Sequence, residues 1–361
     1  MELKEIINKY NSNFFDSWDL PYDSLAKWKN VKSVLVAGSE NKQNTPLLSV
    51  CIPTYKGRAK VLREAIDSIL KQKVDFEYEI IISDNYTVGD NETEALMNEY
   101  CTKYNNIFYY RTDFDFGMYP NWNRAVELCN SELIVLLNND DVMNDGCLKR
   151  LYETAKKTNS ALVASFKGTI VQLDGVDGSY INNLSKAQKI LQALRNNKSF
   201  HLKPDDVLRN IIPTTGCMLF KKSTFIQYGG FNPDYEIADC MFYIKMMKNE
   251  TVQIIPDFLF SKRIQSNGFL NYDAQLNVIG IIYGFGNYYI NQYHKNSKFK
   301  KLILDISVAY MVYGIKSKYN QNIDCKTTLE QFGVRKSIAN MHPKLLTLLN
   351  CVLLTDLIFR K

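Results

Sequence analysis

Residues 132–145 read ELIVLLNNDDVMND, so two adjacent carboxylates, Asp140 and Asp141, directly follow an apolar run. Neighbouring carboxylates repel each other unless a positive charge lies between or in front of them. Together with Asn139 they form an oxygen-rich cluster of the kind that Mn²⁺ or Mg²⁺ prefers, and such cations need only one or two protein carboxylates when substrate phosphates complete the coordination. Taken alone, the same residues are also compatible with a solvated turn or a helix cap.

Two further carboxylates are candidates for the same site. Asp84 ends the apolar run 79–83, and Asp239 opens a stretch rich in Met, Phe and Tyr. Each has an ordinary structural interpretation by itself, which is a strand-end turn for Asp84 and a helix N-cap for Asp239. The elements between them decide whether these side chains can meet.

Strand-like and helix-like segments alternate through this part of the chain. Buried strands are indicated by apolar runs at 47–52, 79–83, 107–110 and 133–137, and helices by the apolar spacing of 61–70, 93–104 and 123–129. This alternation predicts an α/β fold with a mostly parallel sheet flanked by helices. In such sheets ligands bind beyond the carboxyl ends of the strands, so residues 54–55, 84–85 and 138–141 are expected to share one crevice.

Composition narrows the class of protein. The 361 residues are 46% hydrophobic and 23% charged, which is ample for a globular core. The eight Cys form no CxxC pair and the three His are not paired at helical spacing, which favours reduced thiols in a cytosolic protein over a disulfide framework or a zinc site. No run of about 18 apolar residues predicts a membrane-spanning helix, and the first 20 residues do not resemble a signal peptide.

Four separated blocks carry a resemblance to a known family: LLSVCIPTYKGRAKVLREAIDSIL, EYEIIISDN, FDFGMYPNWNRAVELCNSELIVLLNNDD and GGFNPDYEIADCMFYIKM, in this order between residues 47 and 265. Together they resemble family 2 glycosyltransferases of the GT-A fold. The resemblance implies inverting transfer of a sugar from a nucleotide-sugar donor, UDP-linked, to a hydroxyl of a glycan or lipid-linked saccharide in bacterial surface polysaccharide synthesis. It divides the chain into a helical or partly ordered extension and linker (1–46), a GT-A domain (47–270) and a C-terminal helical, basic region (271–361).

The resemblance also assigns roles to residues. The nucleotide and donor are bound by Pro53, Thr54, Tyr55, Arg58, Asp84, Gly117, Asn123 and Asp140, with Asn121 beside them, and Asp84 recognises a uracil or guanine ring. Asn139 and Asp141 form the metal-binding part of the DxD motif, Thr215 and Gly216 belong to the acceptor pocket, and Asp239 is the catalytic base. The chain departs from the family pattern at Asn139, at Ala238 in place of Glu, and at Gln265 in place of His.

Two other function classes stay open on the residues alone. A catalytically silent GT-A-like protein that binds a sugar or nucleotide would accommodate the three departures. A sugar nucleotidyltransferase would share a related sheet, but it needs a Gly-rich phosphate loop near the first strand, and IPTYKGRAK lacks one.

The C-terminal region has its own charge pattern. From Ala274 onward it carries 12 basic and 4 acidic residues on apolar helical segments. Such a region is suited to peripheral contact with an anionic membrane at the inner face of the cell membrane, to packing against the sheet, or to forming a homodimer. No nucleic-acid-binding motif accompanies the charge, so nucleic acid is not an expected partner.

Overall fold

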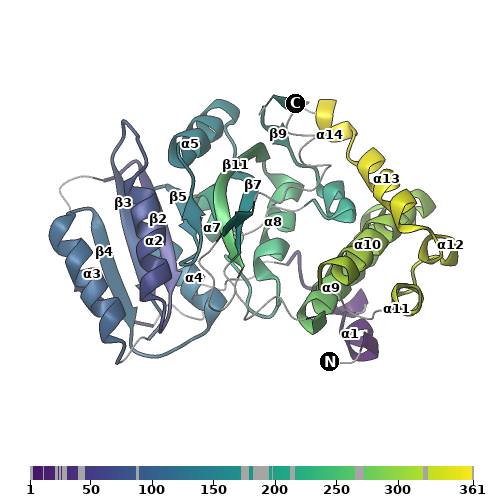
Figure 1. The fold of residues 1–361 in the computed structure, drawn as a ribbon, viewed down its shortest axis with the longest axis horizontal. Coiled ribbons are helices and arrows are strands. Elements are labelled where there is room, and N and C mark those ends of the chain that lie inside the picture. Colours follow the sequence, from purple (N-terminus) through teal and green to yellow (C-terminus); the bar gives the residue numbers. More distant parts are fainter. Residues whose placement is uncertain are drawn as a thin grey trace.

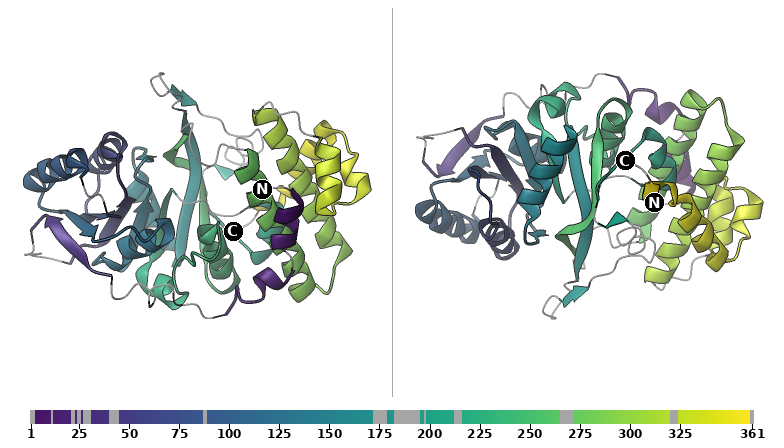
Figure 2. Two further views of the ribbon diagram at one scale, coloured as in Figure 1. Left: turned by 90° about the horizontal axis from the view of Figure 1, so that it is seen from below. Right: turned by 90° about the horizontal axis from the view of Figure 1, so that it is seen from above.

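The computed structural model describes most of the chain, and the described ranges are residues 3–10, 12–20, 23, 26, 31–39, 45–86, 89–171, 179–181, 195–196, 198–211, 216–264, 272–319 and 324–359. They form a large sheet with helices on both faces, beside a helical region that contains both the first and the last helices of the chain (Figure 1). The two perpendicular views place the N-terminal helix against this helical region as well (Figure 2).

One continuous sheet organises the molecule. Its order is β1-β4-β3-β2-β5-β10-β7-β11-β6, with β8 paired to β7 and β9 to β11. The strands are β1 (Ser33–Ala37), β2 (Leu48–Thr54), β3 (Tyr78–Asp84), β4 (Ile107–Thr112), β5 (Leu133–Leu137), β6 (Val142–Met143), β7 (Leu162–Val171), β8 (Ser179–Ile181), β9 (Phe200–His201), β10 (Cys217–Lys221) and β11 (Val252–Ile264). The neighbours β4, β3, β2 and β5 run parallel, as expected from the alternating pattern.

The second half of the sheet mixes directions. β10 pairs antiparallel with β5 and with β7, whereas β7 and β11 run parallel. The predicted α/β sheet flanked by helices, with a C-terminal helical region, is confirmed. The sheet is mixed and not mostly parallel, because six of the ten strand pairs in the described residues run antiparallel. One expectation for the extension is wrong in detail, because Ser33–Ala37 forms an edge strand antiparallel to β4.

Alternate residues of the central strands face two different cores. The core on one face packs α2 (Ala59–Leu70), α3 (Asn91–Lys103) and α5 (Cys147–Thr158) against side chains such as Val50, Ile80 and Val135. The other core packs α4 (Met118–Glu127) and α8 (Ala238–Asn249) against the opposite side chains, such as Ile81 and Leu136. Burial on both faces explains why these strands appear in the sequence as uninterrupted apolar runs.

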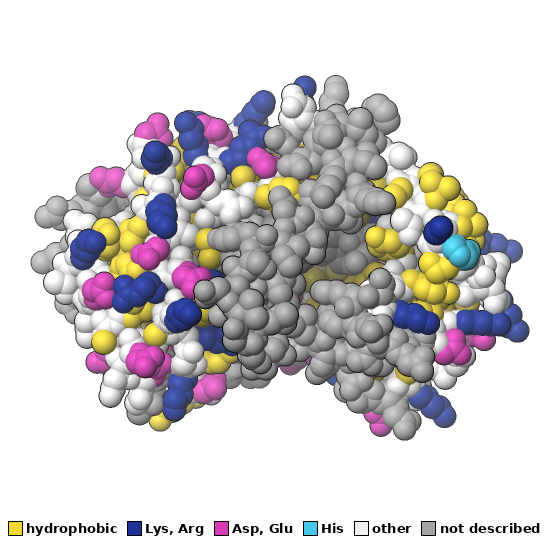
Figure 3. Space-filling model, viewed as in Figure 1, with side chains coloured by type: hydrophobic (Ala, Val, Ile, Leu, Met, Phe, Trp, Pro, Cys, Tyr) yellow, Lys and Arg dark blue, Asp and Glu magenta, His cyan; other side chains and the backbone are white. Residues whose placement is uncertain are grey.

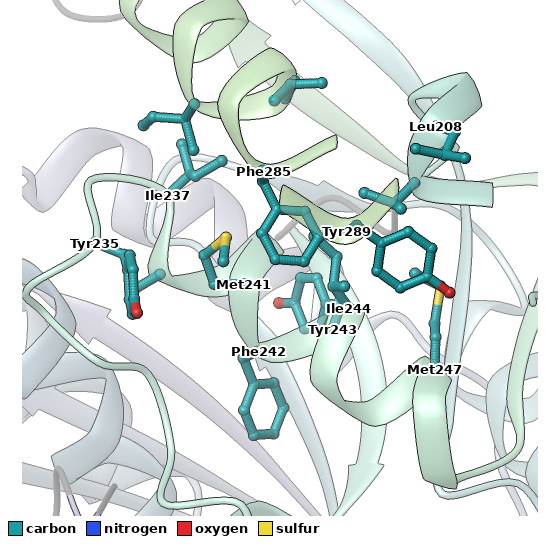
Figure 4. Close-up of a cluster of buried hydrophobic side chains, with 14 of the residues drawn as sticks. Leu208, Tyr235, Ile237, Met241, Phe242, Tyr243, Ile244, Met247, Phe285 and Tyr289 are labelled. Carbon is teal, nitrogen blue, oxygen red and sulfur yellow. The ribbon is translucent and has the colours of Figure 1, made fainter. Parts of the chain in front are cut away.

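The helical region packs against the second core. Its elements are α1 (Leu3–Lys9), η1 (Ser12–Phe15), η3 (Pro204–Arg209), α9 (Tyr272–Tyr293), α10 (Lys298–Tyr319), α11 (Cys325–Phe332), α12 (Lys336–Ala339), α13 (Pro343–Leu353) and α14 (Asp356–Phe359). Figure 4 shows the contact between the two regions, where Met241, Ile244 and Met247 of α8 lie beside Phe285 and Tyr289 of α9. Within the described part of the chain, no helix combines the length and apolar character needed to cross a membrane.

Candidate active site

The ends of β2 and β3 form the first part of the site. Thr54 and Asp84 are direct neighbours across these two parallel strands, so both reach the same edge of the sheet. Asp84 is fully buried and accepts a hydrogen bond from the hydroxyl of Tyr109 on β4. Burial and the Asp84 carboxylate raise the pKa of Tyr109 well above its ordinary value, which keeps this phenol protonated as a donor. Recognition of the nucleotide base by Asp84 stays a prediction.

Asn121 on α4 holds these two strand ends together. Its Nδ2 donates to the carbonyl oxygens of Thr54 at 3.0 Å and Ser83 at 3.1 Å. Its Oδ1 accepts from the Ser83 hydroxyl at 2.8 Å. The helix can begin beside the strands because Gly117, with a φ of 95°, turns the chain just before it. Asn121 therefore holds the ends of β2 and β3 together, and its predicted place beside the donor stays a prediction.

Asn123 uses its amide in a similar way. Its Nδ2 donates to the Phe231 carbonyl at 3.0 Å, and its Oδ1 accepts from the Phe231 N–H at 2.9 Å. The side chain is almost entirely buried. These bonds connect α4 to the segment that leads to Asp239. Contact of Asn123 with the donor stays a prediction.

The DxD loop follows β5 and lies against both β2 and β10. Asn139 donates from Nδ2 to the Thr54 hydroxyl at 3.0 Å, and the Asn138 N–H donates to the Gly216 carbonyl at 3.3 Å. Gly216 also lies directly against β11, because a Cβ there would lie 2.1 Å from Cε2 of Phe260. Thr215, the other predicted acceptor residue, lies outside the described residues, as does Gln265.

Asp141 is the most enclosed carboxylate of this loop. It is fully buried, and its two oxygens accept from the Arg263 backbone N–H at 3.0 Å and from Asn138 Nδ2 at 2.9 Å. Burial and the adjacent Asp140 raise the pKa of Asp141 to about 7. A cation held in front of the two carboxylates would relieve both effects.

Arg263 on β11 is a residue of this loop that the sequence reasoning did not assign. Its guanidinium is buried, donates from Nε to the Asp140 carbonyl at 3.1 Å, and forms an ion pair with Glu64 on α2. Its backbone also holds Asp141, so one residue fixes both members of the acidic pair. Gln265, named above as a departure from the family pattern, stands two residues further along the chain, but only the register of β11 beside β6 brings Arg263 to the loop.

The donor set of the loop suits a hard divalent cation. Asp140 and Asp141 offer carboxylates, and Oδ1 of Asn138 is buried without a hydrogen-bond partner among the described residues. No group of three or more His, Cys, Asp or Glu side chains in the described ranges could hold a metal alone. Such a set therefore fits a cation that takes its remaining ligands from substrate phosphates. Coordination by Asn139 and Asp141 stays a prediction.

Asp239 lies in the first turn of α8, on the far side of α4. The Tyr119 hydroxyl donates to Asp239 Oδ1 at 3.2 Å and to the Glu236 carbonyl at 3.0 Å. Burial and the Asp239 carboxylate raise the pKa of Tyr119 far above its usual value, so it remains a donor. Tyr119 and Asn121 are two residues apart on α4, and this helix therefore links Asp239 to the strand ends that carry Thr54 and Asp84.

Residues of the predicted nucleoside loop lie at the end of β2. Pro53 is the strand residue opposite Ser83. Tyr55 is about half exposed, and the Arg58 guanidinium lies 4.8 Å from its ring centroid. An exposed aromatic ring with a cation beside it is suited to contact a base or a sugar.

Comparison with known proteins shows which protein family the chain matches. Residues 49–229 match the family model described as Glycosyl transferase family 2. The chain is similar to the UDP-Gal:alpha-D-GlcNAc-diphosphoundecaprenol beta-1,3-galactosyltransferase of Escherichia coli, with 22% identity over 61% of this chain and 76% of that protein. It is also similar to the abequosyltransferase RfbV of Salmonella typhimurium, with 34% identity over 27% of this chain and 29% of that one.

Coverage of the relatives is uneven. The chain spans 67%, 34% and 20% of the length of three further curated relatives. Among solved structures it is similar to Staphylococcus aureus TarS 1–349 in complex with UDP-GlcNAc, at 14% identity, a TM-score of 0.49, and 81% and 88% coverage of this chain and of that one. A likeness this distant does not bear on substrate or mechanism.

Proposed function

Because this chain belongs to glycosyl transferase family 2, we propose that it transfers a sugar with inversion from a nucleotide-sugar donor, UDP-linked, to a hydroxyl of a glycan or lipid-linked saccharide. The observation that carries the proposal is the connection made by α4, which contacts the Asp84 strand end through Asn121 and Asp239 through Tyr119. The loop with Asp140 and Asp141 joins the same strand end through Asn139 and Thr54.

The names of relatives support the biological setting. They include a galactosyltransferase acting on a diphosphoundecaprenol-linked sugar, an abequosyltransferase, and two enzymes that glycosylate poly(ribitol-phosphate). We therefore place the reaction in the synthesis of bacterial surface polysaccharide.

In the proposed mechanism Asp239 accepts the proton of the acceptor hydroxyl while that oxygen attacks the anomeric carbon from the face opposite the leaving nucleoside diphosphate. Tyr119 orients the carboxylate by its hydrogen bond to Oδ1. Asp140 and Asp141, fixed by Arg263, would hold Mn²⁺ or Mg²⁺, and such a cation would supply positive charge opposite the departing diphosphate. The buried Asn121 bonds keep the ends of β2 and β3, where the donor is proposed to bind, at fixed separation.

The test replaces Asp239 by Asn and measures two quantities separately. Thermal stabilisation by a panel of nucleotide sugars, with and without Mn²⁺, reports donor binding by mass action. Release of UDP with an acceptor mixture reports transfer. We expect Asp239→Asn to keep the donor-induced stabilisation and to lose transfer, while Asp234→Asn, an exposed residue of the same segment, changes neither.

Equal loss of binding and transfer in Asp239→Asn would contradict the assignment of the base. Exchange of pyrophosphate into a nucleotide sugar would favour a nucleotidyltransferase instead. Stabilisation by a nucleotide sugar without any UDP release from the wild-type protein would favour a catalytically silent binding protein.

We also propose peripheral attachment to the cytoplasmic face of the membrane through α13. Leu345, Leu348 and Val352 are 45%, 59% and 55% exposed and recur at the spacing of one helical face. Figure 3 shows apolar side chains gathered at the C-terminal end of the molecule, with Lys and Arg side chains around them. Apolar side chains with a basic surround fit an anionic lipid surface.

Vesicle sedimentation tests this attachment. Wild-type protein should sediment with vesicles containing anionic phosphatidylglycerol and much less with neutral phosphatidylcholine. Leu348→Ser with Val352→Ser should weaken the binding, whereas Ile226→Ser, which alters an equally exposed apolar residue elsewhere, should not. A concentration-dependent mass that falls with the α13 substitutions, without vesicle binding, would favour a homodimer.

A further inference from the structure

Residues 3–10 and 12–20, which together we call the N-terminal brace, precede the part of the chain that matches the family model at 49–229. They pack on α9 and on the segment that leads into α8, the helix with Asp239 in its first turn. This segment, residues 231–237, ends at Ile237, the N-cap residue of α8. The brace is therefore a feature of this chain that contacts the immediate surroundings of the proposed base.

The brace is fixed firmly to α9. Ile6 and Phe15 are fully buried, and the ring of Phe15 lies edge-on to Phe285 with centroids 5.5 Å apart. Two glycines of α9 permit the close approach: a Cβ on Gly280 would lie 2.3 Å from Ile6, and one on Gly284 would lie 2.3 Å from the Tyr10 carbonyl oxygen. Because the brace packs this closely on α9, its other side chains are held in fixed positions.

Two side chains of the brace reach the 231–237 segment. Lys9 forms an ion pair with Glu236. Phe14 lies edge-on to the buried Tyr235, with ring centroids 5.6 Å apart and an interplanar angle of 84°. These contacts hold consecutive residues of the segment from the side of the helical region.

The opposite side of the same segment is held by α4. The Tyr119 hydroxyl bonds both the Glu236 carbonyl and the Asp239 carboxylate. Glu236 therefore contacts both partners: its side chain pairs with Lys9 of the brace, and its backbone carbonyl accepts from Tyr119, the residue that orients Asp239. The start of α8 depends on such external contacts, because its N-cap residue Ile237 provides no side-chain cap.

We propose that the N-terminal brace sets the position of Asp239, with Lys9 and Phe14 as positioning residues for proton transfer. The inference rests on the proposed role of Asp239 as base. Displacing a catalytic group by about 1 Å can cost on the order of 100-fold in rate, so a partial displacement is expected to lower kcat several-fold without changing donor binding.

A second ion pair supplies a matched control. Asp19 of the brace pairs with Lys248, and Leu20 accepts from Lys245 at 2.9 Å, so the same brace also contacts the far end of α8. Exposed or half-exposed pairs of this kind stabilise a protein by about 0–1 kcal/mol each. Lys9→Met and Lys248→Met should therefore have similar, small effects on the melting temperature.

The experiment measures kcat and the donor KM of UDP release for the following variants of the full-length protein. We expect Lys9→Met to lower kcat about 5- to 20-fold with the donor KM within twofold, Lys9→Arg to restore most of the rate, and Lys248→Met to leave kcat within twofold. Glu236→Gln should resemble Lys9→Met, and the double variant should lose no more than either alone.

The outcomes separate this inference from the proposed function. If Asp239→Asn abolishes transfer while Lys9→Met keeps full kcat, or if Lys9→Met and Lys248→Met lower kcat equally, the positioning role is refuted and the base remains. If Asp239→Asn keeps full transfer, the base assignment fails and the inference falls with it.

Discussion

The amide of Asn121 provides the sharpest test of how the sheet edge is built. Replacing it by Asp keeps the shape of the side chain but removes both Nδ2 hydrogens, which donate to the Thr54 and Ser83 carbonyls. A carboxylate would instead face those two carbonyl oxygens in a site where the side chain is only 4% exposed. Asn121→Ala removes the same bonds without adding a charge.

The magnitude follows from the bonds lost. Each buried polar group left without its partner costs about 1–3 kcal/mol. Asn121→Ala takes the acceptor from the Ser83 hydroxyl and one donor each from the Ser83 and Thr54 carbonyls, but the Thr54 carbonyl keeps its bond from the Asn85 N–H. We therefore expect a loss of about 2–4 kcal/mol after local relaxation. Asn121→Asp should cost more at pH 7, because the buried charge is added. Its carboxyl pKa would be raised in the folded protein, so the excess penalty should shrink as the pH falls and the carboxyl becomes protonated.

Equilibrium urea unfolding at pH 7 and pH 5 measures both variants, and donor-induced stabilisation measures the site. Asn340→Asp is a suitable control, because its exposed amide bonds only a carbonyl of its own helix turn. The reasoning would be refuted by a loss under about 1 kcal/mol for Asn121→Ala, or by an Asn121→Asp variant that is no less stable than Asn121→Ala at pH 7.

Three further outcomes are expected. Gly216→Ala should destabilise the protein by about 1–3 kcal/mol in urea unfolding, because the new methyl group overlaps the buried Phe260 ring. Arg263→Met should weaken Mn²⁺ binding in the presence of UDP by about 10- to 100-fold, measured by calorimetry, because the loop that carries the carboxylates loses its anchor. Burial alone would raise the pKa of Asp205, but hydrogen bonds from Lys300 and His294 outweigh it and hold that pKa below its usual value. The stabilisation from Asp205 is thus present above the unfolded pKa of about 4 and lost as the pH falls through the lower folded pKa, so Asp205→Asn should be less stable at pH 7 and show a shallower loss of stability in acid.

The central strands were predictable because each is buried on both faces. The apolar runs at 47–52, 79–83 and 133–137 coincide with β2, β3 and β5 to within about two residues. The start of α4 was misplaced, at 123 in place of Met118, because a positive φ at Gly117 and a Pro in the first turn leave no apolar spacing to detect. Strand β1 was missed since its partner β4 lies about 75 residues away in the chain.

Some residues of the candidate site could likewise be identified from the sequence, and others could not. The Asp84, Asp140, Asp141 and Asp239 carboxylates stand in blocks that a family resemblance can align. Tyr119 and Arg263 could not be assigned from the sequence, because their roles depend on partners 120 and 123 residues away. No local pattern distinguishes a Tyr that orients a carboxylate from one that fills the core.

The contact between the first helix and α9 also constrains the order in which the chain is completed. Tyr10 and Asn277, which are hydrogen-bonded, are separated by 267 residues. At synthesis rates of about 5–20 residues per second, the apolar side chains of α1 wait roughly 15–50 s before α9 exists to cover them. During that interval the parallel strands β2 to β5 can already pair, while Ile6 and Phe15 remain available to chaperones. The helical region, unlike these four strands, is closed only by a late event in biosynthesis.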